Sequence, residues 1–234
     1  NAGIRKFLAG PESFTPDTNT LLGEVPEVKN FFVCCGFNSI GIGSGGGAGK
    51  VTAEWMMNGH INEDLFIYDI KRFQKFHSDL NFITERITET LGDLYGMHWP
   101  YKQHKTSRNK KLFPYHKELV EAGACFGASS GYERPMWFAL NNEKPEFKYS
   151  YNYQNWYPAV EYETKNSRKN IGLFDLTAFS KYDLKGQNVH NELQKICTAN
   201  IKNEIGRTTY TQMLNKDGGI ETDLTVVCIE HNYF

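Results

Sequence analysis

Six glycines between positions 41 and 49 are the residues whose type and spacing most directly suggest chemistry. Glycine loses more conformational freedom on folding than any other residue, so six together indicate backbone that comes within contact distance of another group. A helix that starts beneath them presents free N–H groups and the positive end of its dipole to that group. We therefore predict a tight loop, followed by a helix, that approaches an anion or an electron-rich ring, as a nucleotide cofactor offers.

The elements around the glycines fit this arrangement. The apolar run 31–35 predicts a buried strand, and the segment from Val51 predicts an amphipathic helix that ends at Gly59, where a C-cap glycine is expected. Cys34 and Cys35 fall in the strand, where cysteine usually acts as a small hydrophobic residue rather than a nucleophile. The glycines would therefore follow directly on a strand.

A second interpretation takes the glycines as a dinucleotide-binding fingerprint. Residues 41–46 satisfy the pattern G-x-G-x-x-G, and Asp69 ends a second apolar run downstream. A stretch this rich in glycine matches the pattern easily by chance, which makes the match weakly specific. Under this interpretation residues 31–70 form a Rossmann unit of an NAD-dependent enzyme, and a strand over 65–70 lies parallel to the strand 31–35.

The remaining pattern predicts a mixed α/β (α+β) chain. Its expected elements are helices over 73–91, 115–122, 156–169 and 188–199, a turn into a strand at 123–127, mostly loop over 132–157, an alternating strand-like run over 180–184, and a hairpin of 208–214 with 220–229 turning at 216–219.

Composition excludes several classes of protein. The 234 residues carry a formal net charge of -1 with scattered lysines, so we expect no nucleic-acid partner. Five cysteines without C-x-x-C spacing and seven dispersed histidines predict neither a disulfide framework nor a metal site, and they favour a reducing compartment. No apolar run approaches the roughly 18 residues of a spanning helix, so we expect no membrane insertion. Because Asn1 replaces an initiator Met and Phe234 ends within a strand-like segment, we expect a fragment.

Six groups of short motifs follow one another along the chain. They are GPESFTPD (10–17), LGEVPE (22–27), FFV with GFNSIG (31–41), GACFG with GYERP and WF (123–138), GLFDL (172–176) and GGIETDLTV (218–226). In this order they resemble the dimethylglycine and sarcosine dehydrogenase family. Its members join an FAD-dependent oxidoreductase domain to a folate-binding domain that is similar to glycine-cleavage aminomethyltransferase, and the resemblance covers nearly the whole chain.

The resemblance implies a domain plan and an activity. Residues 1–70 would be the C-terminal segment of the flavin domain, 71–111 a helical connector, and 112–234 the N-terminal part of the folate domain. The whole enzyme would oxidise a small N-methylated amino acid, dimethylglycine or sarcosine, with FAD, pass electrons to electron-transfer flavoprotein or oxygen, and transfer the one-carbon unit to tetrahydrofolate. It would work in the bacterial cytoplasm or, in a eukaryote, the mitochondrial matrix, and the fragment alone would be inactive.

The resemblance also implies site residues. The family's dinucleotide fingerprint and flavin-tethering histidine have no counterpart in this chain, so the glycines would belong to a later segment that covers the flavin ring from the other side. Gly45 to Gly47 would form the closely packed start of the helix. The residues implied to contact the flavin are Phe37, Asn38, Ser39, Ile40, Gly41, Ile42 and Gly43.

Asp223 matches the acidic position of the folate domain. The resemblance implies a catalytic carboxylate that takes a proton or stabilises a cationic intermediate beside the folate. The alternative is a carboxylate that caps the Gly218-Gly219 turn, a common role beside glycines. A further alternative concerns the whole protein: the regulatory subunit of pyruvate dehydrogenase phosphatase is similar to the same two-domain protein, reused without catalysis.

Overall fold

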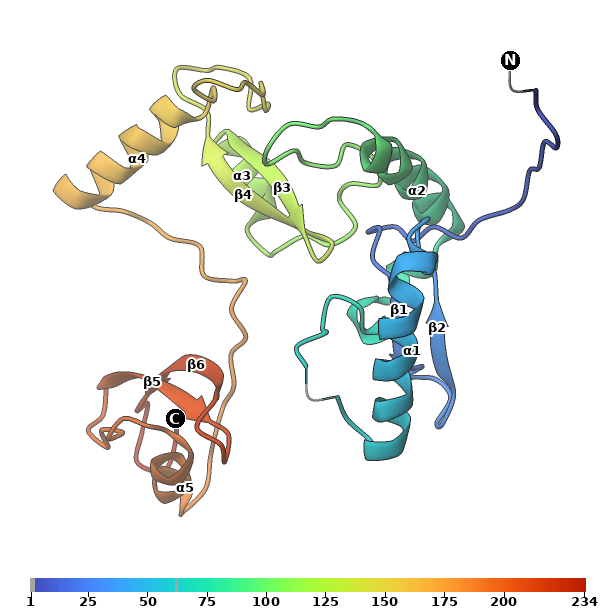
Figure 1. The fold of residues 1–234 in the computed structure, drawn as a ribbon. Helices are drawn as coiled ribbons and strands as arrows, with labels where there is room; N and C mark the ends of the chain where they lie inside the picture. The colour runs from blue at the N-terminus through green and yellow to red at the C-terminus, as the bar shows by residue number, and fades with distance from the viewer. Residues whose placement is uncertain (1–2, 62) are drawn as a thin grey trace. The chain divides into compact units, whose positions relative to one another are not determined.

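The computed structural model describes residues 3–61 and 63–234. The chain divides into two compact units, residues 1–175 and 176–234, which are described separately (Figure 1). Helices and strands occur in both, which confirms the mixed α and β character. In the described residues the strands form three separate antiparallel pairs, β1 with β2, β3 with β4, and β5 with β6.

The first unit begins with a hairpin and a long helix. β1 (Leu21–Glu24) pairs with β2 (Phe32–Cys35), and α1 (Gly41–Asn58) packs against both. Trp55 of α1 lies so close to Gly23 that a Cβ on this glycine would be 2.4 Å from the indole, and Gly23 has φ 106°. Only glycine fits there. The predicted strand and the C-cap at Gly59, which is left-handed at φ 76°, are both confirmed.

The glycine cluster is helical, so the predicted loop is wrong. α1 begins at Gly41 and contains all six glycines in its first half. Glycine costs about 1 kcal/mol relative to alanine in a helix interior, and this intrinsic preference favoured a loop. The second half of α1 is anchored by the buried side chains of Thr52 and Trp55. Once such a segment is helical, each further hydrogen bond fixes only one more residue, so the helix propagates through poor helix formers.

The buried position predicted for Cys34 and Cys35 is also wrong, since both are exposed. β2 is paired only with β1 among the described residues. A two-stranded hairpin leaves its other edge and its outer face open, whereas the prediction assumed a strand inside a larger sheet.

The Rossmann alternative does not hold for the described residues. Residues 66–68 form a turn, which leads through Asp69 into the 3-10 helix η1 (Ile70–Arg72) rather than a strand parallel to β2. Asp69 accepts a hydrogen bond from the Lys71 amide at 2.8 Å, and Arg72 donates to Asp17 at 2.7 Å. These contacts turn the chain where the alternative needs it extended.

The predicted helix over 73–91 begins later than expected. A second 3-10 helix, η2 (Lys75–Ser78), precedes α2 (Leu80–Tyr95). Asp79 sets the start of α2, because its carboxylate accepts a hydrogen bond from the Phe82 amide at 2.8 Å.

The rest of the first unit holds α3 (His116–Glu121), β3 (Ala124–Ser129), β4 (Tyr132–Phe138) and α4 (Tyr157–Lys169). The two helices and the strand β3 were predicted. β4 was not, because residues 132–157 were predicted to be mostly loop; the strand contains Pro135. This proline lies beside a bulge in the ladder between Cys125 and Phe126, where a missing N–H is tolerated.

A buried ion pair ties the connector to β4. Arg108 donates from Nε to Glu133 Oε1 at 2.9 Å, and the Glu133 side chain is 2% exposed. Burial alone would raise the pKa of this carboxyl, but the hydrogen bonds and charge of Arg108 hold the pKa below its ordinary value. The pair fixes the connector against the same hairpin whose other residues, Cys125 and Trp137, form a core with Ala159 of α4.

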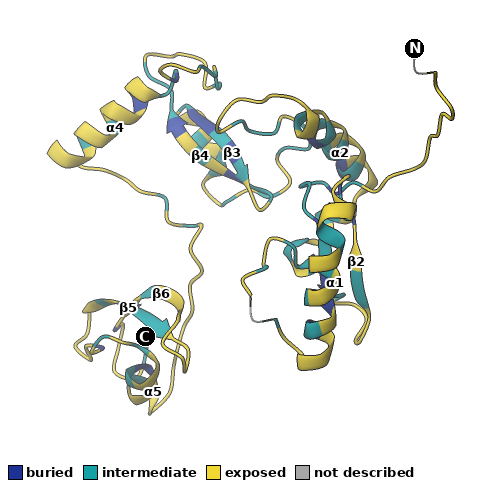
Figure 2. Ribbon diagram, in the orientation of Figure 1, coloured by how far each residue is buried: buried dark blue, intermediate teal, exposed yellow. Residues whose placement is uncertain are grey.

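The second unit consists of α5 (Val189–Ile196) and the hairpin of β5 (Thr208–Leu214) with β6 (Ile220–Val227). The hairpin confirms its prediction, and the helix is shorter than predicted. The run 180–184 is not a strand; within it only the backbone of Leu184 pairs, with Phe234 at 2.8 Å. The core residues of this unit are Leu193, Ile201, Val226, Cys228 and Phe234. Buried residues are drawn in dark blue in Figure 2.

Candidate functional site

The segment between β2 and α1 is organised around Asn38, which is 2% exposed. Its Oδ1 accepts a hydrogen bond from the Thr15 amide at 2.8 Å, and its Nδ2 donates to the Gly36 carbonyl at 2.6 Å. The residue has φ 49°, a conformation that asparagine tolerates better than most residues. The side chain therefore fastens the start of α1 to the loop that precedes β1, from inside the protein.

The next residues present backbone and apolar side chains outward. Ser39 has φ 67° and accepts a hydrogen bond from the Tyr95 hydroxyl at 2.5 Å. Ile40 is the N-cap of α1 without a side-chain cap, and Ile42 is fully exposed. Phe37 packs under Gly41, where a Cβ would lie 3.2 Å from it. The side chains of Ile40 and Ile42, at the first turn of α1, are therefore open to solvent.

One face of α1 is bare. A Cβ placed on the other glycines of the cluster would meet no atom of the described residues within 4 Å; these glycines are Gly43, Gly45, Gly46, Gly47 and Gly49. Most of this helix is coloured as exposed in Figure 2. The N-terminal turn also carries no acidic side chain. A free helix N-terminus beside a bare backbone face can hold an anionic or electron-rich planar group at close range.

Asp223 lies on β6, opposite Gln212 of β5. Its Oδ2 accepts a hydrogen bond from the Tyr210 hydroxyl at 3.0 Å, and both residues are on the exposed side of the hairpin. The opposite side carries the buried Thr211 and Val226. Asp223 is therefore an accessible carboxylate on a strand whose other face is fixed in the core.

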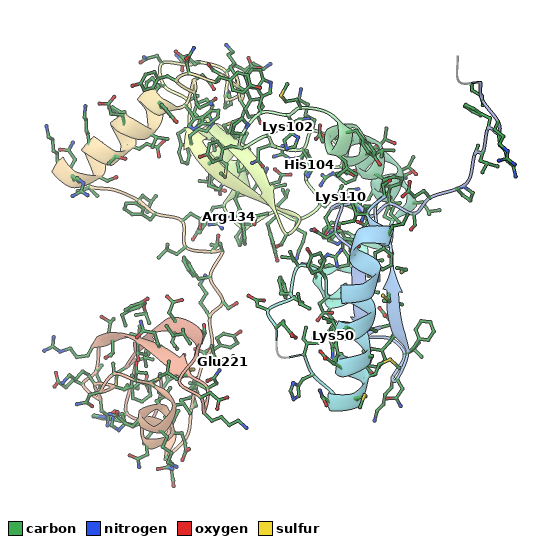
Figure 3. The ribbon with its side chains drawn as sticks, in the orientation of Figure 1. Lys50, Lys102, His104, Lys110, Arg134 and Glu221 are labelled. Atoms are coloured by element: carbon green, nitrogen blue, oxygen red, sulfur yellow. The ribbon has the colours of Figure 1, made fainter. Side chains whose placement is uncertain are left out.

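The turn beside Asp223 has a different cap. Asn215 Oδ1 accepts hydrogen bonds from the amides of Asp217 at 3.0 Å and Gly219 at 2.8 Å, while its Nδ2 donates to Glu221 at 2.9 Å. Glu221 is labelled on the hairpin in Figure 3. Since Asn215 caps the turn, the turn-capping alternative for Asp223 loses its basis. Sequence reasoning missed Asn215 and Tyr210, although the hairpin register already places Tyr210 on the same face as Asp223.

A cluster of possible metal ligands also escaped the sequence analysis. Glu89, Asp93 and His104 bring ligand atoms within 4.8 Å of one another. These acceptors already serve the protein: Glu89 accepts from the Thr106 amide at 2.9 Å, and Asp93 pairs with Lys102. Burial, reinforced by Arg86, lowers the pKa of His104. Lys102 and His104, labelled in Figure 3, thus join the connector to α2.

In the described part of the chain, no helix combines the length and apolar character required to cross a bilayer.

Two protein-family models match the chain. Residues 58–112 match the FAD dependent oxidoreductase central domain, and residues 115–234 match the GCVT N-terminal domain. The two occur in that order, and the second covers the α3–β4 region together with the whole second unit.

Curated proteins are similar over almost the full chain. The 4-methylaminobutanoate oxidase (formaldehyde-forming) of Paenarthrobacter nicotinovorans is 42% identical over 97% of this chain. Mitochondrial sarcosine dehydrogenase of Homo sapiens is 34% identical over 96%, and the mitochondrial pyruvate dehydrogenase phosphatase regulatory subunit of Mus musculus is 31% identical over 99%. The chain spans 27% of the length of each of these relatives.

Proposed function

Because the chain belongs to the dimethylglycine and sarcosine dehydrogenase family, with an FAD dependent oxidoreductase central domain before a GCVT N-terminal domain, we propose that it is part of a flavin-dependent enzyme that demethylates N-methylated amino acids. The proposal rests on one observation: the two domains follow each other within one chain. The proposed division is a flavin-domain segment (1–70), a connector (71–111), through which the match to the FAD dependent oxidoreductase central domain extends, and a folate-domain segment (112–234).

The cofactors of this proposal are FAD and tetrahydrofolate. When bound, FAD would accept the hydride given up by the N-methylated amine, and tetrahydrofolate would accept the carbon that is released. Electrons would leave to electron-transfer flavoprotein or to oxygen, in the bacterial cytoplasm or the mitochondrial matrix. The residues of this chain contribute by binding, orientation and proton handling.

The start of α1 fits the flavin. A Cβ on five of its glycines would stand on an open backbone surface, and its uncapped N-terminus would stabilise negative charge on an electron-rich ring. We propose that Phe37, Ser39, Ile40, Ile42 and the backbone of Asn38, Gly41 and Gly43 line this site. The side chain of Asn38 holds the segment in place from behind.

Asp223 fits the folate reaction. It is exposed, it is not used by the turn, and the Tyr210 hydroxyl orients it through one oxygen while the other oxygen stays available. We propose that this carboxylate takes up a proton or stabilises positive charge during transfer of the one-carbon unit.

Anaerobic titration of the purified longer protein tests the activity. Sarcosine, dimethylglycine and 4-methylaminobutanoate are added in turn, and bleaching of the flavin absorbance is followed; we expect bleaching by at least one. A protein that holds flavin but is bleached by none of the three refutes the demethylase. That result would favour the regulatory alternative, which rests on the 31% identity to the phosphatase subunit.

Asp223→Asn separates the two half-reactions. The amide keeps the size of the side chain but cannot accept a proton or carry charge. We expect flavin bleaching at the wild-type rate, with formaldehyde released in place of methylenetetrahydrofolate. Glu221→Gln is the matched control on the same strand and should keep the folate product. An undiminished yield of methylenetetrahydrofolate in Asp223→Asn removes this residue from the chemistry.

A further inference from the structure

The first unit contains an aromatic pocket that the proposed function does not use. Its volume is about 360 Å³, within the roughly 300–1,000 Å³ range of small-molecule sites. The walls come from the connector, β4, the loop that follows β4, and α4. The residues central to the argument are Gln103, Trp137, Phe147, Trp156 and Tyr157.

The rings of the pocket stand nearly perpendicular to one another. Phe147 and Trp156 have centroids 5.2 Å apart and planes at 82°, and Phe147 meets Trp137 at 6.3 Å and 76°. Tyr157 is set at 88° to Trp156, with centroids 6.3 Å apart. Perpendicular rings direct both faces and edges at one space. One face of Phe147 is taken by Tyr149, which lies parallel to it with centroids 5.7 Å apart and planes at 4°.

The pocket is also neutral and rigidly framed. None of its lining residues is charged. Gln103 supports one wall, because its side-chain carbonyl accepts from the Ala128 amide at 3.2 Å and its backbone N–H donates to the Tyr149 hydroxyl at 2.8 Å. Within residues 3–61 and 63–234, the lysines and arginines that lie over aromatic rings use Trp55, Phe73, Phe82, Tyr132 and Tyr233, none of which lines the pocket.

We propose that this pocket binds a methylated ammonium group. The negative faces of aromatic rings attract a cation, and the attraction grows when water is excluded. Methyl groups weaken the hydration of an ammonium and give it an apolar surface, which suits walls without carboxylates. The lining offers a primary ammonium no carboxylate, and the side-chain carbonyl of Gln103 already accepts a hydrogen bond from the Ala128 amide. The ligand class matches the substrate class of the proposed function, on which the inference rests to that extent.

The first experiment compares two probes of equal shape on the unmodified longer protein by calorimetry. Choline carries a trimethylammonium head, and 3,3-dimethyl-1-butanol has carbon in place of the nitrogen. A cation–π site binds choline at least about tenfold more tightly. Equal affinities would show a merely apolar cavity and overturn the proposal, as would absence of choline binding.

Variants locate the binding. Tyr157→Leu removes a half-exposed wall with little risk to folding, and Trp156→Leu removes the wall that Phe147 faces; each should weaken choline binding at least about tenfold. Tyr151→Leu is the control, because this ring packs on Trp99, 4.4 Å away, and does not line the pocket. Affinity unchanged in Tyr157→Leu and Trp156→Leu overturns the proposal.

The flavin spectrum distinguishes this inference from the proposed function. Choline in the aromatic pocket should bind with the flavin absorbance unchanged, and Tyr157→Leu should still be bleached by saturating N-methylated substrate. If choline shifts the flavin spectrum and binds equally well to Tyr157→Leu, it occupies the flavin site. That result contradicts the proposal that choline binds in the aromatic pocket. Absence of bleaching by any substrate, with choline binding intact, refutes the demethylase alone.

Discussion

The start of α1 and the β5–β6 hairpin are the two candidate sites, and they are built in opposite ways. The hairpin exposes Asp223 on one face while its other face packs on α5 around Leu193. α1 is anchored through Trp55 in its second half, but a Cβ on five of its six glycines would meet no described atom within 4 Å. The hairpin is therefore complete within the chain, whereas the glycine face is suited to something the chain does not supply.

The two sites differ in the free energy that their backbone conformations cost. Each helical glycine costs about 1 kcal/mol relative to alanine, so the six glycines of α1 cost on the order of 5 kcal/mol. The hairpin has no comparable cost, and its turn uses Asn215 and Gly218 in conformations these residues favour. We propose that so many glycines in one helix serve the close approach of a partner.

The largest loss of stability is expected when the buried side chain of α5 that packs on the hairpin is shortened. Leu193→Ala removes a side chain that is 1% exposed and should destabilise the second unit by about 2–5 kcal/mol. Hydrogen exchange of the β5 and β6 amides measures the loss. Leu214→Ala, at a position 42% exposed, should cost about 1 kcal/mol or less. Flavin content of the longer protein should be unchanged; its loss in Leu193→Ala would show that the two sites are not independent.

The next effect concerns Asn38. Asn38→Ala leaves the Thr15 amide and the Gly36 carbonyl without their buried partner, at a cost of about 1–3 kcal/mol, and the longer protein should bind flavin more weakly. Hydrogen exchange of the β1 and β2 amides, followed at increasing urea, measures the stability. Asn30→Ala is the control, because Asn30 shares the positive φ, 62°, but is exposed. An equal loss of unfolding free energy in both variants would show that Asn38 matters only through its backbone conformation and not through its side-chain hydrogen bonds.

These residues show what the sequence could and could not predict. The hairpin was predictable because Lys216 to Gly219 specify the turn locally and the strands alternate around it. The role of Asn38 was not, since its partner Thr15 is 23 residues away and an exposed and a buried asparagine look alike in sequence. Asp223 was named through resemblance, yet Tyr210 follows from the register alone once the hairpin is accepted.

The errors have a common physical origin. The loop predicted over the glycines and the buried strand predicted for Cys34 and Cys35 both rested on local preference, which ignores what surrounds the segment. Local preference decides turns and caps. The packing of a helix or strand against distant residues decides the rest.

A smaller effect tests the glycine face directly. Gly46→Ala adds a methyl group where nothing lies within 4 Å, so it should stabilise α1 in this chain by about 1 kcal/mol. In the longer protein the same methyl group should lower flavin content, because it separates backbone and ring. Gly92→Ala in α2 is equally open and should stabilise without affecting flavin. Full flavin content with undiminished stabilisation in Gly46→Ala would show that the face stays bare.

The smallest effect on stability is expected for Tyr210→Phe, which removes only the hydroxyl that donates to Asp223 at 3.0 Å. Both groups are on the exposed side of the hairpin, so unfolding free energy should change by no more than about 0.5 kcal/mol. The carboxylate then loses its orienting partner but keeps its charge and its position on β6. Methylenetetrahydrofolate yield should fall by less than in Asp223→Asn, with flavin bleaching unchanged, because orientation and proton transfer contribute separately. A loss equal to that of Asp223→Asn would make the hydroxyl itself part of the chemistry, whereas no loss would leave Asp223 to act without it.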